Sequence, residues 1–268
     1  RFLIGNLDDF DENEILPFEE MPELEQWVLH RLTEVDVVVR QGFVDYNYHK
    51  VYNALYNFCA VDLSAFYFDI RKDALYCDGK MTIRRRASRT VLDQVFKKVT
   101  KWFAPILAFT AEEIWQSRFP SQDDSVHLQT FDDIDQSWKN DELAAKWEKI
   151  RSLRKVVTGA LEIERREKRI GSSLQGSVHV YVKDSDYITA FEDIDLAEVS
   201  ITSSAIMVEG DAPEGAFTLD DVADVAVTCA LSEGGKCERC WQVLPEVGTI
   251  VGHDDICGRC ADAVEAYK

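Results

Sequence analysis

The chain has 268 residues, enough for two or three domains with packed cores. Its composition, 46% hydrophobic and 29% charged, is ordinary for a soluble globular protein, and no apolar run reaches the ~18 residues of a transmembrane helix. The net charge of −19, taken over the whole chain, argues against binding to nucleic acid.

The N-terminus, RFLIGNLDDF, lacks the basic region and apolar core of a signal peptide. It begins with Arg1 rather than Met, so we expect a piece of a longer protein. Apolar residues at three- and four-residue spacing then predict a first helix over residues 21–39, interrupted by Gly42.

A second helix is predicted over residues 44–70. Its expected buried side consists of Tyr48, Val51, Tyr52, Leu55, Phe58, Cys59, Leu63 and Phe66. A third helix is predicted over residues 81–103, and Pro105 ends or kinks it because proline lacks an N–H and clashes with the preceding turn.

Residues 110–113 (TAEE) have the spacing of a capping box and predict a short helix through Trp115. A long, charge-rich helix is predicted over residues 141–169, closed by Gly171 in the position just after the C-cap. Residues 1–25 are predicted to be an acidic entry segment, and residues 21–171 an antiparallel helical bundle.

The pattern changes after Gly171. Residues 177–182 alternate polar and apolar side chains, as a half-buried strand does. A short helix over residues 186–196 and strands over residues 199–208 and 222–230 complete the prediction of a small α/β domain.

This α/β domain spans residues 172–231. Residues 232–235 (SEGG) predict a flexible joint into a terminal module of residues 232–268.

That module carries four cysteines in two C-x-x-C pairs, Cys237 with Cys240 and Cys257 with Cys260, separated by sixteen residues. This spacing predicts one tetrahedral Zn²⁺ held by four thiolates. Such a shell leaves no open coordination position, so the metal is expected to be structural. Iron in the same cage, or His253 in place of one thiolate, are the alternatives.

Lys236, Arg239, Trp241 and Arg259 flank the cysteine pairs and suit a polyanion with exposed bases. Trp241 has two interpretations, packing over the metal site or stacking on a base. The cations would contact phosphates, remain solvated, or balance the negative charge of the thiolates.

The other three cysteines, Cys59, Cys77 and Cys229, are predicted to be small buried residues. Free thiols together with a thiolate metal site indicate a reducing, cytoplasmic compartment.

Charge is unevenly distributed along the chain. Residues 80–101 hold eight Lys or Arg and one acid, and residues 149–183 hold nine Lys or Arg and three acids. Residues 185–235, in contrast, hold twelve Asp or Glu and no Lys or Arg. This segregation is compatible with a basic face on an acidic protein, and equally with solvated helix surfaces.

Arg84, Arg85, Arg86 and Arg89 lie at a predicted helix start, where the helix dipole disfavours cations. Their presence there is a modest indication of an external anion, the alternative being a solvated helix end. The basic cluster at residues 165–169 is favoured by a helix C-terminus and is discounted. No histidine pattern, Gly-rich phosphate loop or carboxylate constellation predicts a catalytic site.

Several segments, in order, resemble bacterial isoleucyl-tRNA synthetases. Residues 1–10, 52–67 and 69–76 are similar to their anticodon-binding region. The stretch FAPILAFTAEEIW resembles a segment shared with the valyl and leucyl relatives, whereas IGSSL and KCERCW are closer to the isoleucyl branch. The resemblance covers essentially the whole chain.

The resemblance implies a mainly α fold of the class Ia synthetase type. It assigns a helical anticodon-binding domain to residues 1–171, a small α/β junction domain to residues 172–231 and a four-cysteine zinc module to residues 232–268. The implied partner is the anticodon stem-loop of tRNA(Ile), bound by a cytoplasmic monomer, with no DNA or membrane partner.

The same resemblance implies that the whole enzyme attaches isoleucine to its tRNA with ATP and Mg²⁺. The catalytic and editing domains would lie upstream of Arg1, so this fragment is expected to be inactive and to contain no catalytic residue. Under this hypothesis Arg84, Arg85 and Arg89 contact phosphates, whereas Lys236, Arg239 and Trp241 lie near loop bases.

Two other classes of protein remain as alternatives. One is the DNA-binding region of a formamidopyrimidine-type glycosylase, whose terminal finger resembles this cysteine module. It would need an N-terminal proline and acid, which Arg1 and Phe2 do not provide. The other is a non-enzymatic zinc scaffold that binds proteins.

Overall fold

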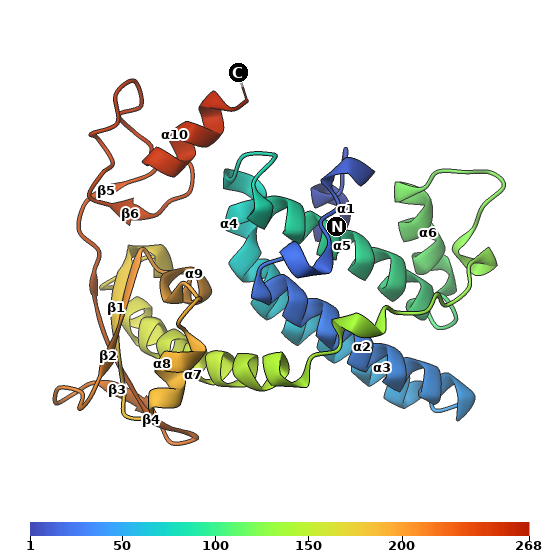
Figure 1. Cartoon of the computed structure of the whole chain (residues 1–268), viewed down its shortest axis with the longest axis horizontal. Coiled ribbons are helices and arrows are strands. Elements are labelled where there is room, and N and C mark those ends of the chain that lie inside the picture. Colours follow the sequence, from blue (N-terminus) through green and yellow to red (C-terminus); the bar gives the residue numbers. More distant parts are fainter. Residues whose placement is uncertain (268) are drawn as a thin grey trace. The chain divides into compact units, whose positions relative to one another are not determined.

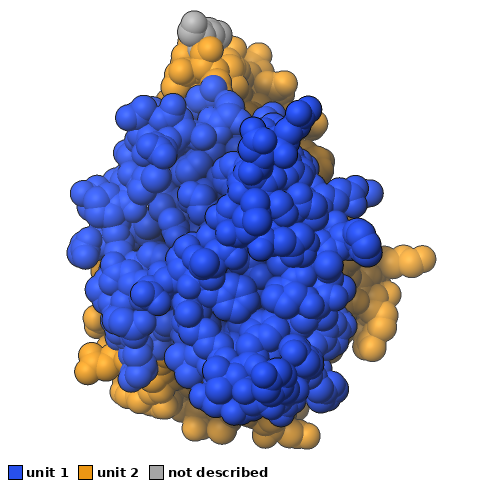
Figure 2. All heavy atoms as spheres, turned by 90° about the vertical axis from the view of Figure 1, so that its right-hand side faces the viewer, with its two compact units in different colours: residues 1–141 blue, residues 142–268 orange. Residues whose placement is uncertain are grey.

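The computed structural model describes residues 1–267 and divides into two compact units, Arg1–Asp141 and Glu142–Lys268 (Figures 1 and 2). The first, here called the helical unit, contains six α-helices and a π-helical segment. They are α1 (Phe2–Asn6), α2 (Glu23–Val44), α3 (Tyr48–Asn57), the π segment (Phe58–Phe68), α4 (Asp69–Cys77), α5 (Ile83–Phe103) and α6 (Ala108–Arg118). Within the described residues, no helix is both long enough and apolar enough to cross a membrane.

The apolar stripe predicted for the first helix is confirmed. Trp27, Val28, Leu32, Val35 and Val39 are all buried on α2. The expected interruption at Gly42 is wrong, because α2 continues through it to Val44. A Cβ at Gly42 would lie 2.5 Å from Cγ2 of Val51, so this glycine allows close contact between α2 and α3.

The second predicted helix begins and ends later than expected, since the chain remains helical from Tyr48 through the π segment to Cys77. Val51, Leu55 and Phe58 are buried as predicted. Tyr48 and Tyr52 are instead exposed, and that part of the prediction is wrong. The tyrosines form a second stripe along α3, next to the buried stripe. Both stripes have four-residue spacing, so the sequence did not show which of them is buried.

The predicted capping box is also wrong. Helix α6 begins at Ala108, after an N-cap residue, Leu107, that makes no side-chain cap hydrogen bond. Thr110 therefore lies inside the helix. Glu112, rather than Glu113, makes the nearby polar contacts, accepting hydrogen bonds from the Ser125 hydroxyl and the Val126 N–H.

The second unit combines a long helix, α7 (Asp141–Arg166), with a four-stranded sheet of order β2-β1-β4-β3. Strand β1 pairs in parallel with β2 and antiparallel to β4, which also pairs antiparallel to β3. The strands are β1 (Gly176–Val182), β2 (Ser204–Glu209), β3 (Phe217–Leu219) and β4 (Val222–Leu231). Gly159 of α7 lets the Phe217 ring approach, because a Cβ there would lie 2.7 Å from it.

The helix expected over residues 186–196 is divided into α8 (Ser185–Ala190) and α9 (Leu196–Ser200). The strand expected to begin at Val199 accordingly begins at Ser204. The Asp195 side chain caps α9 by accepting hydrogen bonds from Ala197 N–H and Glu198 N–H, which explains the second helix start.

Helix α7 ends earlier than predicted, and the residue that closes it is Lys168 rather than Gly171. Lys168 has φ +60°, and its N–H donates to the Arg165 carbonyl while Arg169 N–H donates to the Glu164 carbonyl. This is the hydrogen-bond pattern of a Schellman motif, with a lysine in the left-handed position that glycine normally takes.

The remaining elements form the terminal module, residues 232–267. They are the hairpin of β5 (Gly235–Lys236) and β6 (Val243–Leu244), followed by α10 (Gly258–Glu265). The predicted fold class is confirmed as a mainly helical chain with a small sheet region and a C-terminal cysteine cluster. The three-domain division stays a prediction, and in the compact units α7 is grouped with the sheet.

Candidate zinc centre and nucleic-acid interface

The hairpin that precedes the cysteine cluster depends on glycine. Gly235 and Lys236 of β5 pair with Leu244 and Val243 of β6. Gly234 has φ +120°, and a Cβ there would lie 2.3 Å from the carbonyl carbon and oxygen of Leu244. Because backbone atoms occupy that space, the joint expected to be flexible is closely packed at this residue.

The four cysteines come from both ends of the module. Cys237 and Cys240 lie in the turn after β5, Cys257 is the N-cap of α10, and Cys260 lies in the first turn of that helix. All four are buried, and their sulfur atoms lie within 4.8 Å of one another. All are free thiols, so no disulfide competes for them.

This geometry fits a tetrahedral metal. Cys240 Sγ and Cys257 Sγ are 3.8 Å apart. Four ligands at about 2.3 Å from a central Zn²⁺ define a tetrahedron with edges of about 3.8 Å. The residues therefore fit a zinc ion bound only by sulfur, which would hold the two knuckles together and supply no catalytic position.

The backbone around Cys237 stabilises negative charge on its sulfur. Burial opposes ionisation of this thiol, but hydrogen bonds from the N–H groups of Cys240, Cys257 and Arg239 lower its pKa to about 6. The Cys240 and Cys257 N–H groups lie 3.5 and 3.4 Å from Cys237 Sγ. Burial, in contrast, raises the pKa of Cys257 to about 11.

Further hydrogen bonds join the two knuckles. Glu238 N–H donates to the Asp255 carbonyl at 2.9 Å, and Gly258 N–H donates to Glu246 Oε1 at 3.0 Å. His253 Nε2 lies 2.9 Å from Glu265 Oε1. Since His253 is engaged with Glu265 and lies outside the cysteine cluster, the alternative in which it replaces a thiolate is not favoured.

Trp241 follows the first knuckle and is largely exposed to solvent. Its side chain is 60% exposed, and its backbone has φ +67°. Lys236 Nζ lies 5.6 Å from the centre of the Trp241 ring, a cation–π distance. Of the two interpretations offered by the sequence, this exposure favours a ring free to stack on a ligand over one that packs on the metal site.

The flanking arginines are arranged differently from Lys236. Lys236 is exposed, whereas Arg239 and Arg259 are half-buried beside the cage. The structure thus places Lys236, Arg239 and Trp241 at one knuckle.

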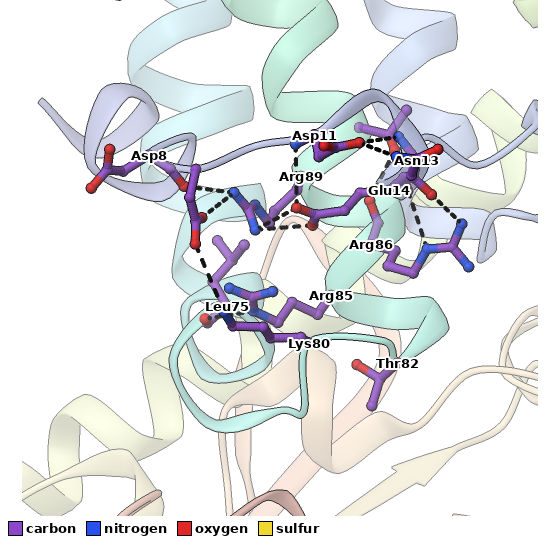
Figure 3. A network of polar contacts seen from close by, with 12 residues as sticks. Asp8, Asp11, Asn13, Glu14, Leu75, Lys80, Thr82, Arg85, Arg86 and Arg89 are labelled. Atoms are coloured by element: carbon purple, nitrogen blue, oxygen red, sulfur yellow. Dashed lines mark hydrogen bonds and ion pairs between the residues drawn. The ribbon is translucent and has the colours of Figure 1, made fainter. Parts of the chain in front are cut away.

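The arginines of α5 mainly form hydrogen bonds and ion pairs within the helical unit (Figure 3). Arg84 pairs with both carboxylate oxygens of Asp78, at 2.8 and 2.9 Å. Arg89 is 2% exposed and donates to both oxygens of Glu14 at 2.9 Å and to Asp9 at 2.9 Å. Burial and three carboxylate contacts do not fit the expected phosphate contact by Arg89.

The other two arginines of this run contact backbone carbonyls. Arg86 donates to the carbonyls of Asn13, Glu14 and Ile15. Arg85 donates to the Leu75 carbonyl at 3.4 Å and is half-buried (Figure 3). Arg85 is therefore the member of the predicted trio whose charge is not balanced by a carboxylate among the described residues.

The basic runs seen in the sequence meet acids in the fold. Lys98 and Lys101 pair with Asp132, and Lys97 pairs with Asp93. In the second unit the basic run pairs with acids of the acidic segment, in the pairs Lys149–Asp186, Lys155–Asp221 and Lys183–Asp211. These contacts argue against an extended basic face, and they show that several cations of these runs form ion pairs instead of being only solvated, as the other interpretation had it.

The three remaining cysteines are free, as expected, but only Cys77 is fully buried. Cys59 and Cys229 are half-buried, and burial raises the pKa of each to about 11. These two thiols therefore stay protonated near neutral pH, and all three cysteines are separate from the metal cage.

Two families match this chain. The family described as an anticodon-binding domain of tRNA ligase matches residues 25–182. A zinc finger found in FPG and IleRS matches residues 234–263, the segment that contains the cysteine cage. The zinc finger alone does not separate a glycosylase from a synthetase, whereas the helical match does.

Proteins named isoleucine–tRNA ligase are similar over nearly the whole chain. Those of Agrobacterium fabrum and Ruegeria pomeroyi are each 48% identical over 98% of this chain, and that of Caulobacter vibrioides is 47% identical over 98%. The chain spans about a quarter, 27%, of the length of these relatives. Because the helical family covers more than half of the sequence, this chain belongs to the anticodon-binding domain family of tRNA ligases.

Proposed function

We propose that this chain is the tRNA-binding region of an isoleucine–tRNA ligase and that it binds the anticodon stem-loop of tRNA(Ile). The names of its relatives support the choice of isoleucine, and the helical family supports the anticodon as the target. The whole enzyme would attach isoleucine to tRNA(Ile) with ATP and Mg²⁺. That chemistry belongs to the parts of such an enzyme that this chain does not include.

The observation that carries the proposal is the exposed Trp241 beside a closed thiolate cage. One structural Zn²⁺ bound by Cys237, Cys240, Cys257 and Cys260 would fix the turn that presents Trp241 and Lys236. An indole ring next to a cation suits an unpaired base and its phosphate, because stacking and charge act on the same nucleotide.

Other contacts follow from exposure and pairing. Arg239 would contact the loop near Trp241. Arg85 would reach a phosphate, whereas Arg84 and Arg89 would hold the surrounding segments through Asp78 and Glu14. The binding residues are therefore proposed to be Lys236, Arg239 and Trp241, with Arg85 as a separate phosphate contact.

We also propose that the protein acts as a monomer in the cytoplasm, without DNA or a membrane as partner. Seven free cysteines, four of them in a metal-binding cluster, support a reducing compartment.

Replacement of Trp241 by Ala tests the proposal. Loss of one base stack is expected to weaken binding of a tRNA(Ile) transcript by about 1–3 kcal/mol, or roughly 5- to 160-fold in Kd. Fluorescence anisotropy with labelled tRNA measures this, and zinc content is determined in parallel. Trp241→Phe, which keeps a ring, is the matched control and should retain most of the affinity.

An unchanged Kd for Trp241→Ala, with one zinc per chain retained, would remove Trp241 from the interface. Equal binding of tRNA(Ile), a non-cognate tRNA and a DNA duplex would contradict the proposed partner itself.

A further inference from the structure

Helix α10 carries two of the four cysteines of the metal cage and lacks a cap of its own. Cys257 is its N-cap residue, and Cys260 lies in its first turn. N-cap side chains normally accept a hydrogen bond from a first-turn N–H, because those N–H groups have no partner inside the helix. Cys257 makes no such bond, and its sulfur lies in the cysteine cage. An acceptor for the start of α10 therefore has to come from another part of the module.

Glu246 supplies this acceptor from the loop between the two knuckles. Its Oε1 accepts a hydrogen bond from the Gly258 N–H at 3.0 Å. Gly258 is the first residue of α10 and directly follows Cys257. The backbone of Glu246 is itself held in a turn, since its carbonyl accepts hydrogen bonds from the Thr249 N–H at 3.0 Å and the Thr249 hydroxyl at 2.7 Å. A fixed turn thus grips the helix start that presents two metal ligands.

The charge of the Glu246 carboxylate does not explain its position. The positive end of the α10 dipole attracts a carboxylate. A metal ion bound by four thiolates keeps a net negative charge, however, and repels it. Among the described residues, no cation forms an ion pair with Glu246. Because the two electrostatic effects oppose each other, we expect the acceptor oxygen to matter more than the charge.

The far end of α10 offers a comparison within the same module. His253, in the same loop, places Nε2 2.9 Å from Oε1 of Glu265, the last residue of the helix. A helix of this length spans about 12 Å, so this contact acts on the end remote from Cys257. The loop therefore makes one contact beside the ligands and one away from them.

We propose that Glu246 is a positioning residue of the zinc centre, which caps α10 and so holds Cys257 and Cys260 in the arrangement that the metal requires. Without it, water would bind the Gly258 N–H, and α10 would still form but its start would be less restrained. Zinc would then bind more weakly and leave faster. The inference rests on the zinc ion of the proposed function and is independent of the proposed RNA.

The test uses the 268-residue chain loaded with zinc, in competition with a chelator of known affinity. Glu246→Ala is expected to weaken zinc binding roughly 3- to 30-fold, mainly through faster release. Glu246→Gln keeps an acceptor oxygen and loses the charge. It should bind zinc within about twofold of the unsubstituted chain, because amide and carboxylate caps are similarly effective.

Substitution of Co²⁺ for zinc gives a spectroscopic check on the same variants. At saturating Co²⁺, both should show the absorption bands of a tetrahedral ion with four sulfur ligands, because Glu246 is not itself a ligand. Loss of these bands in Glu246→Ala would mean that the cage no longer forms, which overturns a role limited to positioning.

The donor of the bond can be removed independently by Gly258→Pro. Proline suits the first position of a helix and has no N–H. Cys257 has the extended conformation that precedes proline, with φ −76° and ψ 164°, and a Cβ at residue 258 would meet no atom closer than 3.7 Å. Gly258→Pro should weaken zinc binding as much as Glu246→Ala, and the double variant no more than either. Additive effects would show that Glu246 acts through something other than this bond.

His253→Ala is the matched control, because it removes a contact between the same loop and the other end of α10. It is expected to change zinc binding by less than about twofold. An effect as large as that of Glu246→Ala would mean that the loop only stabilises the module in general, and unchanged binding in Glu246→Ala would remove its role. Failure of the unsubstituted chain to retain zinc would overturn the zinc centre itself, and the inference with it.

Discussion

The helical unit and the terminal module bury charged or ionisable groups by different means. In the helical unit, large side chains such as Trp102, Phe96 and Leu32 fill the core, and a carboxylate can be buried among them because protein donors surround it. In the terminal module, two short strands and one helix of eight residues enclose four thiols. The N–H groups around these sulfur atoms are too few to stabilise four thiolates, so a bound cation is needed to balance their negative charge.

Glu25 illustrates the first case. It is completely buried, and its carboxylate accepts hydrogen bonds from the Tyr67 hydroxyl at 2.9 Å and from Arg71 at 2.7 and 2.8 Å. Ser88 donates a further bond at 3.2 Å. Burial raises the pKa of Tyr67 well above its ordinary value, so the phenol remains a donor at any physiological pH. A buried charge is tolerated here because every contact is supplied from within the unit.

From this comparison we expect the helical unit to be stable by itself and the terminal module to depend on a bound metal. A module of this size has little apolar surface to bury, and its free energy of folding is largely the free energy of metal binding. The predictions that follow test this difference.

Removal of zinc should have the largest effect and should act on one region only. Structural zinc sites contribute about 10–16 kcal/mol of apparent binding free energy. A chelator is therefore expected to unfold the terminal module while the helical unit keeps its helical circular dichroism and thermal transition. Limited proteolysis with mass spectrometry should locate the new cleavage sites after residue 231. Loss of the helical transition at the same chelator concentration would show that the regions are not independent.

Replacement of Glu25 by Ala should destabilise the helical unit by about 3–5 kcal/mol, because it removes the buried carboxylate that accepts two hydrogen bonds from the buried Arg71 guanidinium. Urea unfolding measures the change. The matched control is Tyr67→Phe, which removes one hydrogen bond to the Glu25 carboxylate and should have the smaller effect, about 1.5–3 kcal/mol. Zinc affinity should be the same in both variants. Equal effects of the two substitutions would mean that Glu25 is not held by charge pairing.

A pair of glycine substitutions should give the smallest effects and still separate the two regions. In Gly42→Ala the new Cβ meets the Val51 side chain, and overpacking of about 1–3 kcal/mol is partly offset by a gain of about 1 kcal/mol in helix propensity. In Gly234→Ala it meets the Leu244 backbone at a positive φ, so nothing offsets the strain.

Gly42→Ala is thus expected to lower the urea midpoint slightly with no change in zinc retention. Gly234→Ala is expected to release zinc to a competing chelator more readily, with no change in the midpoint of the helical unit. The opposite assignment of effects would contradict the division into a core-stabilised and a metal-stabilised region.

Local patterns predicted the elements whose neighbours agree with them. The buried stripe of α2 from Trp27 to Val39, the third helix and the alternation of β1 were all readable, because burial follows the period of the element. Predictions failed where another residue, nearby in the chain or in the fold, set a helix end or a contact that the local pattern did not indicate. Asp195 starts a new helix inside a predicted one, Lys168 ends α7 before its glycine, and Gly42 serves a contact with Val51 rather than a helix end.

The exposure of the tyrosines on α3 was predicted wrongly for a related reason. Tyr48, Tyr52 and Tyr56 have the same spacing as a buried stripe, and only the contact between α2 and α3 determines which of two adjacent stripes faces inward. Their phenolic oxygens were a signal in the sequence, but a polar atom at the tip of a ring does not fix burial.

The sequence by itself predicted a thiolate metal site, because two C-x-x-C pairs supply four sulfurs close together in the chain. Only the structure disfavoured His253 as a ligand, through its contact with Glu265. The sequence also determined the family, through the order of its segments. Which charges are available to a ligand was decided only by the tertiary structure. Arg89 and Arg85 are four residues apart on one helix, yet Glu14 neutralises the first and no described carboxylate neutralises the second. An arginine's partner is set by distances across the fold, and these distances are not encoded in spacing along the chain.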